Sequence, residues 1–132
     1  MRALDVTRFL LVCAGGAAGT AARYLTALWA GAAFGPAFPF GTLIVNVAGS
    51  FLIAFIMQIG IATEWLSMDV RIMLTTGVMG GFTTYSTFNY ETTNYFRDGA
   101  WLIGFANVIA TLLGCLAAGL LGLALARLIV GR

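Results

Sequence analysis

Residues 80 to 91 read Gly-Gly-Phe-Thr-Thr-Tyr-Ser-Thr-Phe-Asn-Tyr-Glu, a polar stretch inside a chain that is otherwise almost entirely apolar. Of the 132 residues, 61% are hydrophobic, 9% are charged and none is histidine. Because an unpaired polar group in hydrocarbon is costly, such a cluster is expected to serve a function. The Gly80-Gly81 pair also weakens a helix interior, so the stretch predicts a helix that is broken near mid-membrane.

Long apolar runs on both sides of this stretch predict an all-α membrane protein. Its four transmembrane helices would form a single domain over residues 1–132. Each run is near or above the ~20 residues that a bilayer requires, and the connections are too short for a soluble domain. The predicted transmembrane helices span about residues 8–31, 41–62, 70–96 and 100–130, with the third one broken at Gly80-Gly81.

The basic residues, all arginines, are distributed unevenly between the two ends of the predicted helices. Those at the end that carries both termini are Arg2, Arg8, Arg71, Arg127 and Arg132. Arg97 lies at the other end, and Arg23 lies near that end of the first helix. Cytoplasmic loops are enriched in arginine and lysine, so this bias favours cytoplasmic termini in a multi-pass protein of the plasma membrane, or cell inner membrane.

Small residues repeat at four-residue steps in the first and fourth predicted helices. They are Gly15 and Gly19, with Ala27 and Gly31 on the same ridge, in the first, and Ala110, Gly114, Ala118, Gly122 and Ala126 in the fourth. Small residues let helix backbones approach closely in lipid, where packing supplies most of the attraction. These steps predict close helix or subunit contacts, and four helices alone make a poor pore, so we expect an oligomer.

Polar residues form stripes along three of the predicted helices, and the stripes can converge on one narrow track. They are Asn46 and Ser50; Thr83, Ser86, Thr87 and Tyr90; and Asn107, Thr111 and Cys115. A single Ser or Thr in a membrane helix usually bonds the carbonyl four residues earlier, which is a structural role. The amides of Asn46 and Asn107 cannot be satisfied so locally, so we expect each to face a cavity or a partner.

The track is rich in hydrogen-bond donors, to which Tyr85 and Phe88 add the positive edges of their rings. It has neither the carboxylate ring of a cation channel nor a histidine or mid-helix aspartate relay for protons. A small anion therefore fits best. The expected break would also free backbone carbonyls, and a bound monovalent cation, a water or a hydroxyl from another helix could satisfy them.

Three of these segments together make the sequence resemble a known family. The string Gly80-Gly81-Phe82-Thr83-Thr84-Tyr85-Ser86-Thr87-Phe88, together with Gly41-Thr42-Leu43-Ile44-Val45-Asn46 and Arg23, is similar to the CrcB/Fluc family of fluoride ion channels. The likeness covers nearly the whole chain, and its central string is unusual. It differs at Tyr85, where the family has phenylalanine.

The resemblance implies a fluoride-selective channel for passive fluoride efflux that assembles as an antiparallel, dual-topology homodimer. A pair of oppositely oriented paralogues is the alternative assembly. It further implies a structural sodium ion at the dimer centre, on the backbone carbonyls of Gly80 and Thr83, and no organic cofactor. The implied fluoride pathway uses Asn46, Tyr85 and Phe88, with Arg23 in the vestibule and Glu91 at the pore mouth. The polar stripes add Ser86, Thr87, Asn107 and Thr111 to this pathway.

Two other functions remain open as alternatives. A small multidrug-type proton-coupled transporter needs a membrane-embedded glutamate in its first helix, where this chain offers only Arg23. A non-transporting assembly subunit would explain the small-residue steps but would leave the polar stripes without a reason. An enzyme is not expected, because no histidine activates the hydroxyls, and dispersed arginines predict no nucleic-acid partner.

Overall fold

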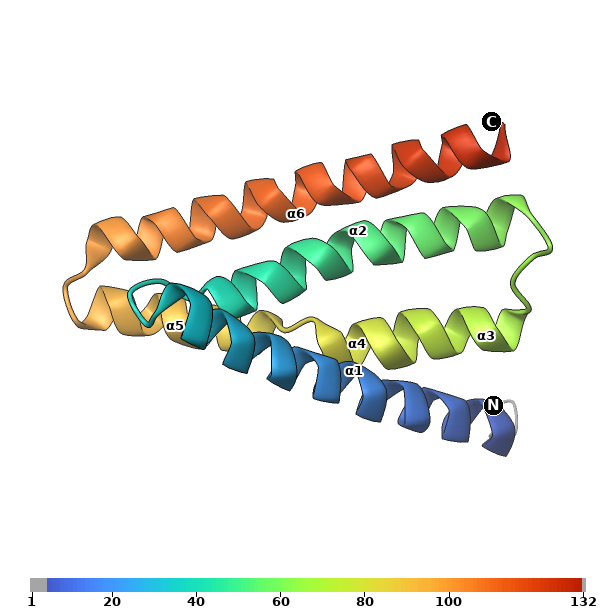
Figure 1. Cartoon of the computed structure of the whole chain (residues 1–132), viewed down its shortest axis with the longest axis horizontal. Coiled ribbons are helices and arrows are strands. Elements are labelled where there is room, and N and C mark those ends of the chain that lie inside the picture. The colour runs from blue at the N-terminus through green and yellow to red at the C-terminus, as the bar shows by residue number, and fades with distance from the viewer. Residues whose placement is uncertain (1–4, 132) are drawn as a thin grey trace.

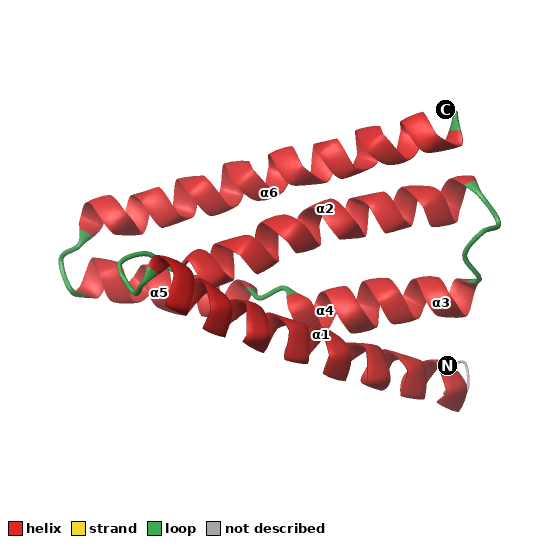
Figure 2. Ribbon diagram, in the orientation of Figure 1, coloured by secondary structure: helices red, strands yellow, loops and turns green. Residues whose placement is uncertain are grey.

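The computed structural model describes residues 5–131, which form four antiparallel helical rods with both ends of the chain at the same end of the bundle (Figures 1 and 2). Arg2 and Arg132, which entered the predicted charge bias, lie outside the described residues. The first, second and fourth rods are single helices, and the third is built from four segments. The elements are α1 (Val6–Phe34), α2 (Phe40–Ala62), α3 (Met68–Ile72), the π-helix η1 (Met73–Met79), α4 (Gly80–Phe82), α5 (Tyr85–Arg97) and α6 (Trp101–Val130).

Local signals define both ends of α1. The side chain of Asp5 accepts a hydrogen bond from the backbone N–H of Arg8 at 3.2 Å and so caps the start of the helix. At the other end Gly35 adopts a φ of 74°, which favours glycine, and its N–H bonds the carbonyl of Gly31 at 3.1 Å. The helix therefore begins and ends close to the predicted limits.

The third rod is broken near Gly80-Gly81, as predicted, but the two glycines themselves remain helical. Gly80 has helical dihedrals (φ −61°, ψ −37°), and Gly81 lies within α4. The chain leaves the helix at Thr83 (ψ 160°) and Thr84 (φ −153°), and α5 begins at the next residue. Gly81 is needed for packing instead: a Cβ added there would meet the backbone carbonyl of Gly16 in α1.

Glycines let α1 lie directly against η1. A Cβ added at Gly15 would lie 2.7 Å from the carbonyl oxygen of Met73, and one at Gly77 would lie 2.9 Å from that of Val12. A Cβ at Gly19 would overlap the carbonyl of Val78. Real Cβ atoms do not make such contacts, so this backbone-to-backbone packing requires glycine. The predicted close-contact face of the first helix is confirmed at Gly15 and Gly19 as a helix contact within the chain, but not at Gly31, where an added Cβ would meet no atom within 4 Å.

The small-residue face of α6 packs on α2. Ala118, Gly122 and Ala126 are buried, and a Cβ added at Gly122 would meet the backbone carbonyl of Phe51. By length and composition, α2 and α6 are the two described helices that are apolar enough to cross a membrane, with mean hydropathies of 2.1 and 2.4. The all-helical architecture with four rods agrees with the prediction, and α2 and α6 match two of the four predicted spans. Membrane crossing by the first and third rods stays a prediction.

At the end of the bundle that carries the termini, charged side chains join neighbouring elements by hydrogen bonds and an ion pair. Arg8 donates from Nε to the carboxylate of Asp69 at 2.6 Å, which joins α1 to α3. Arg71 donates to the carbonyl of Gly60 at 2.7 Å and so satisfies the last turn of α2. At the opposite end, Arg97 pairs with its neighbour Asp98.

Candidate functional site

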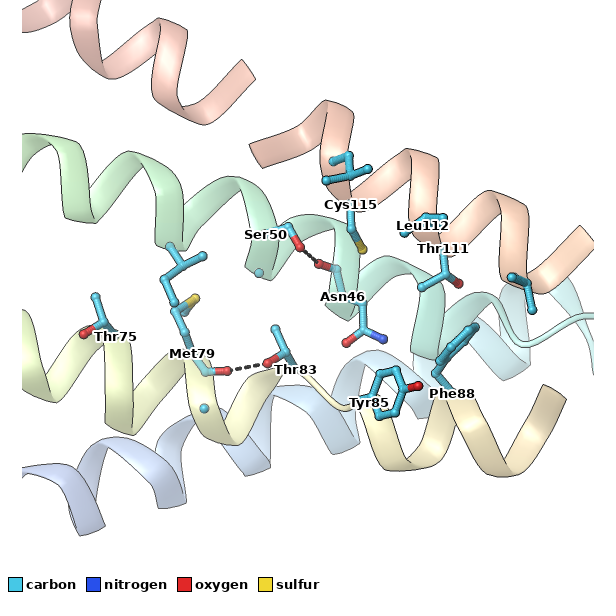
Figure 3. A pocket seen from close by; sticks show the side chains of 15 residues that line it. Asn46, Ser50, Thr75, Met79, Thr83, Tyr85, Phe88, Thr111, Leu112 and Cys115 are labelled. Carbon is cyan, nitrogen blue, oxygen red and sulfur yellow. Dashed lines mark hydrogen bonds between the residues drawn. The ribbon is translucent and has the colours of Figure 1, made fainter. Parts of the chain in front are cut away.

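A groove of about 680 Å³ opens beside the break in the third rod, between α2, α5 and α6 (Figure 3). Its wall is mixed: apolar side chains alternate with hydroxyls, an amide and two aromatic rings. The groove therefore joins residues that are far apart in the sequence, as the converging stripes predict. The predicted site residues on its wall are Asn46, Gly80, Thr83, Tyr85, Phe88 and Thr111.

Asn46 holds the broken backbone in place. Its Nδ2 donates to the carbonyl oxygen of Thr84 at 3.0 Å, and its Oδ1 accepts from the N–H of Thr84 at 2.8 Å. Both residues are 8% exposed. An extended residue inside a membrane helix loses its helical partners, so one amide side chain here replaces two backbone hydrogen bonds. Asn46 was expected to face a partner or a cavity, and it does both: it bonds Thr84 and lines the groove.

Thr84 was not among the predicted site residues, although it is central to the break. Its hydroxyl accepts from the N–H of Thr87 at 3.2 Å, which caps the start of α5, and donates to the hydroxyl of Thr87 at 3.0 Å. The hydroxyl of Ser86 lies 3.3 Å from it. The signal was present in the sequence, since threonine directly before a helical segment is a common N-cap.

Two aromatic rings from the first turn of α5 enter the groove together. The ring centroids of Tyr85 and Phe88 lie 5.7 Å apart at an interplanar angle of 54°. Tyr85 is 77% exposed, whereas Phe88 is half-buried. Ring edges carry partial positive charge, so the pair can offer C–H edges and one phenolic hydroxyl to an electronegative guest.

A second cavity, of about 270 Å³, lies between α1, α2 and the start of α5. Its wall includes Arg23 and Thr87, together with Thr20 and Thr84. Thr84 borders this cavity, while its partner Asn46 borders the groove. The pair of hydrogen bonds between them therefore lies between the two spaces, and the structure assigns Arg23 and Thr87 to one side and Tyr85 and Phe88 to the other.

Glu91 lies on a third cavity, of about 330 Å³, beside the loop that joins α1 and α2. Its Oε1 accepts a hydrogen bond from the hydroxyl of Thr42 at 2.8 Å. Its Oε2 is buried, with no hydrogen-bond partner among the described residues. Sequence reasoning did not single out Thr42 as a site residue, although it belongs to the motif that contains Asn46.

Asn107 and Ser86 are off the walls of these three cavities, as far as the described part of the chain extends. Ser86 is exposed at the start of α5. Asn107 is 1% exposed, and its Nδ2 donates to the hydroxyl of Thr92 at 2.9 Å. Their places in an ion pathway stay predictions.

Within residues 5–131, no three His, Cys, Asp or Glu side chains gather as they would around a metal ion. Backbone carbonyls are the other oxygen donors at the break. The carbonyl of Gly80 would bond the N–H of Thr84 in a continuous helix, but that N–H is bonded to Asn46. A carbonyl on the groove wall is thereby left for another partner.

Comparison with known proteins agrees with this geometry. A family model described as CrcB-like protein, Camphor Resistance (CrcB), matches residues 10–123. The chain belongs to this CrcB-like family. It is 53% identical over 126 residues to the fluoride-specific ion channel FluC of Anaeromyxobacter dehalogenans, an alignment that covers 96% of this chain and 100% of the relative.

Other members of the family give the same picture. The fluoride-specific ion channel FluC of Sorangium cellulosum is 50% identical over 123 residues, which cover 93% of this chain and 97% of the relative. That of Geobacter metallireducens is 48% identical over 112 residues, which cover 85% and 90%. These relatives confirm the predicted family and its class, an ion channel rather than an enzyme.

Proposed function

We propose that this CrcB-like chain is a fluoride-selective channel through which fluoride leaves the cytoplasm passively. The observation that carries the proposal is the groove beside the helix break, where Asn46, Tyr85, Phe88 and Thr111 meet in a chain that is half identical to proteins named fluoride-specific ion channels. Fluoride enters cells as the neutral acid and dissociates there, so a passive exit would lower its cytoplasmic level.

The chemistry of the groove suits a small, strongly hydrated anion. Its described wall contains no charged side chain, so the ion would be held by hydrogen bonds and ring edges. The amide of Asn46 uses one N–H on Thr84, and its second N–H is available as a donor. Fluoride is smaller than chloride and accepts stronger hydrogen bonds, so a wall of donors without a fixed charge favours fluoride.

The proposed route runs between the two cavities on either side of the break. Arg23, in the smaller cavity, would draw anions toward the membrane interior, and Thr87 on the same wall would supply a hydroxyl. Asn46 and the aromatic pair would then receive the ion in the groove. We keep Glu91 at the pore mouth and Ser86 along the route as predictions, whereas Asn107 is enclosed and bonded to Thr92 and would act on the route from outside it.

A second subunit is part of the proposal. Besides Tyr85, α5 exposes Asn89, Tyr90 and Thr93, a polar surface that lipid would not solvate. A second copy in the opposite orientation, or an oppositely oriented paralogue, would cover this surface and close the open side of the groove. The proposed assembly is thus an antiparallel dimer in the plasma membrane.

The break also supports the proposed structural sodium ion. Gly80 and Thr83 lie on the groove wall, and no atom lies within 4 Å of a Cβ added at Gly80, so its backbone can be approached. Carbonyl oxygens of these two residues, doubled by the second subunit, would suit a hard monovalent cation. The ion would stabilise the assembly by neutralising carbonyl dipoles that the break leaves unpaired.

Fluoride efflux from liposomes tests the proposal. The purified chain is reconstituted with internal potassium fluoride, and valinomycin is added so that potassium can balance the exit of charge. We expect rapid fluoride release and little chloride release. No fluoride release, or equal release of chloride, would refute the channel. Release that requires an opposing pH gradient would instead favour a fluoride/proton exchanger.

A further inference from the structure

Helix α5 carries the aromatic pair, yet the break separates it from the helix before it. It has 13 residues and packs chiefly against α6, with a smaller contact to α2. Because no continuous helix fixes the rotation of α5 about its own axis, side contacts must do so. That rotation decides how the ring of Phe88 lies in the groove.

A buried hydrogen bond joins α5 to α6. Nδ2 of Asn107 donates to Oγ1 of Thr92 at 2.9 Å, and the two residues are 1% and 6% exposed. The hydroxyl of Thr92 donates its one hydrogen to the carbonyl of Phe88 at 2.8 Å, which leaves its oxygen free to accept. The contact thus runs from α6 through Thr92 to the backbone of Phe88.

The other neighbours of this contact match a positioning role. Oγ1 of Thr111, on the groove wall, lies 3.5 Å from Oδ1 of Asn107. One turn away, a Cβ added at Gly104 would overlap the ring of Phe96, so the two helices touch closely there. Apolar contact alone permits small rotations, whereas a buried hydrogen bond is directional and costly to leave unmade.

We propose that Asn107 is a positioning residue of the ion pathway, which acts through Thr92 to fix the rotation of α5 and the place of the Phe88 ring. Asn107 then has no direct contact with fluoride, since its side chain is enclosed and its amide is engaged. The inference rests on the proposed function, because its effect is a change in the rate of fluoride transport.

Replacing Thr92 separates the two roles of Asn107. Thr92→Val removes the acceptor but leaves Asn107 intact, so a direct fluoride contact would survive, whereas a positioning contact would be lost. Thr92→Ser keeps the hydroxyl and is the conservative rescue. Thr26→Val is the matched control, because its hydroxyl also bonds the carbonyl four residues earlier, that of Ala22 in α1, at 2.8 Å, and it lies outside the proposed subunit contact and the groove wall.

The measurement is fluoride efflux per reconstituted dimer, with assembly checked by gel filtration and unfolding followed by heating in detergent. We expect Thr92→Val and Asn107→Leu each to lower efflux by about tenfold. The double variant should be no slower than either single one, because both changes remove the same contact. Thr92→Ser and Thr26→Val should keep efflux close to that of the unaltered chain.

Each other outcome overturns a definite claim. Normal efflux in Thr92→Val with loss in Asn107→Leu would show that Asn107 meets the ion directly. If both variants melt at lower temperatures but keep their efflux per dimer, the contact contributes only to stability and does not position α5. An unaltered chain that releases no fluoride would refute the proposed function itself, and the positioning role with it.

Discussion

Asn46 is the residue on which the site depends most, because it meets the helix break and the groove at once. Its amide bonds both backbone groups of Thr84, so its oxygen must accept and its nitrogen must donate. A single side chain thereby supplies the hydrogen-bond partners of both backbone groups of an extended residue, and it also lines the groove. Few other side chains of this size carry a donor and an acceptor side by side.

Replacing Asn46 by aspartate should therefore stop fluoride transport. Asn46→Asp keeps an acceptor for the N–H of Thr84 but sets a carboxylate against the Thr84 carbonyl and puts negative charge beside the anion route. We expect efflux from liposomes to fall by about tenfold or more, with the dimer still formed. Thr26→Val is the control: its hydroxyl bonds only the carbonyl of Ala22 in its own helix, so efflux should persist. An Asn46→Asp chain with normal efflux would place the route elsewhere.

At the scale of elements, the sequence predicted which segments form helices better than it predicted where the third one breaks. Apolar length and arginine-flanked runs define the rods, and these depend on local composition. The break depends on tertiary contacts: Asn46 binds Thr84 from another helix, and α1 packs on Gly81. Those contacts override the weak helix propensity of Gly80 and Gly81, which a single sequence cannot reveal.

The same reasoning explains the candidate site. From the polar stripes, Asn46, Ser50, Thr83 and Thr111 lie on one groove, because a helical period fixes which side chains share a face. The resemblance and the ring edges, not the stripes, pointed to Tyr85 and Phe88 on the same wall. The stripes also drew in Asn107, which shares a stripe with Thr111 but points between α5 and α6. Whether a residue of a stripe faces the groove or a neighbouring helix depends on how the helices cross. The periodicity of the sequence carries no information about these crossings.

The contact between α1 and η1 makes a sharp prediction about stability. Gly19→Ala would push a methyl group into the carbonyl of Val78, and backbone cannot move aside as a flexible side chain can. We expect the free energy of unfolding to fall by about 1–3 kcal/mol, measured by thermal unfolding in detergent. Gly31→Ala is the control in the same helix, because no atom lies within 4 Å of the added Cβ. It should leave stability unchanged or raise it by about 0.5–1 kcal/mol. Equal effects of the two changes would contradict this packing.

At the scale of the whole molecule, the remaining question is how two chains cover the polar face of α5. Both ends of the described chain lie at one end of the bundle, so each copy has a definite orientation in the membrane (Figure 1). Arg8, Arg71 and Arg127 lie at that end, and Arg97 lies at the other. This bias is modest, and an antiparallel homodimer requires that both orientations occur.

Labelling of the α5–α6 turn distinguishes a homodimer from a pair of paralogues. Asp98→Cys places an exposed thiol at the end opposite the termini, after Cys13 and Cys115 are changed to alanine. Acidic residues contribute little to orientation, so the loss of Asp98 should not flip the chain. In a homodimer with two orientations, a membrane-impermeant maleimide should label about half of the chains in intact cells and all of them after permeabilisation. Complete labelling, or none, in intact cells would mean a single orientation, and the second subunit would then have to be an oppositely oriented paralogue, because one chain alone leaves Asn89, Tyr90 and Thr93 facing lipid.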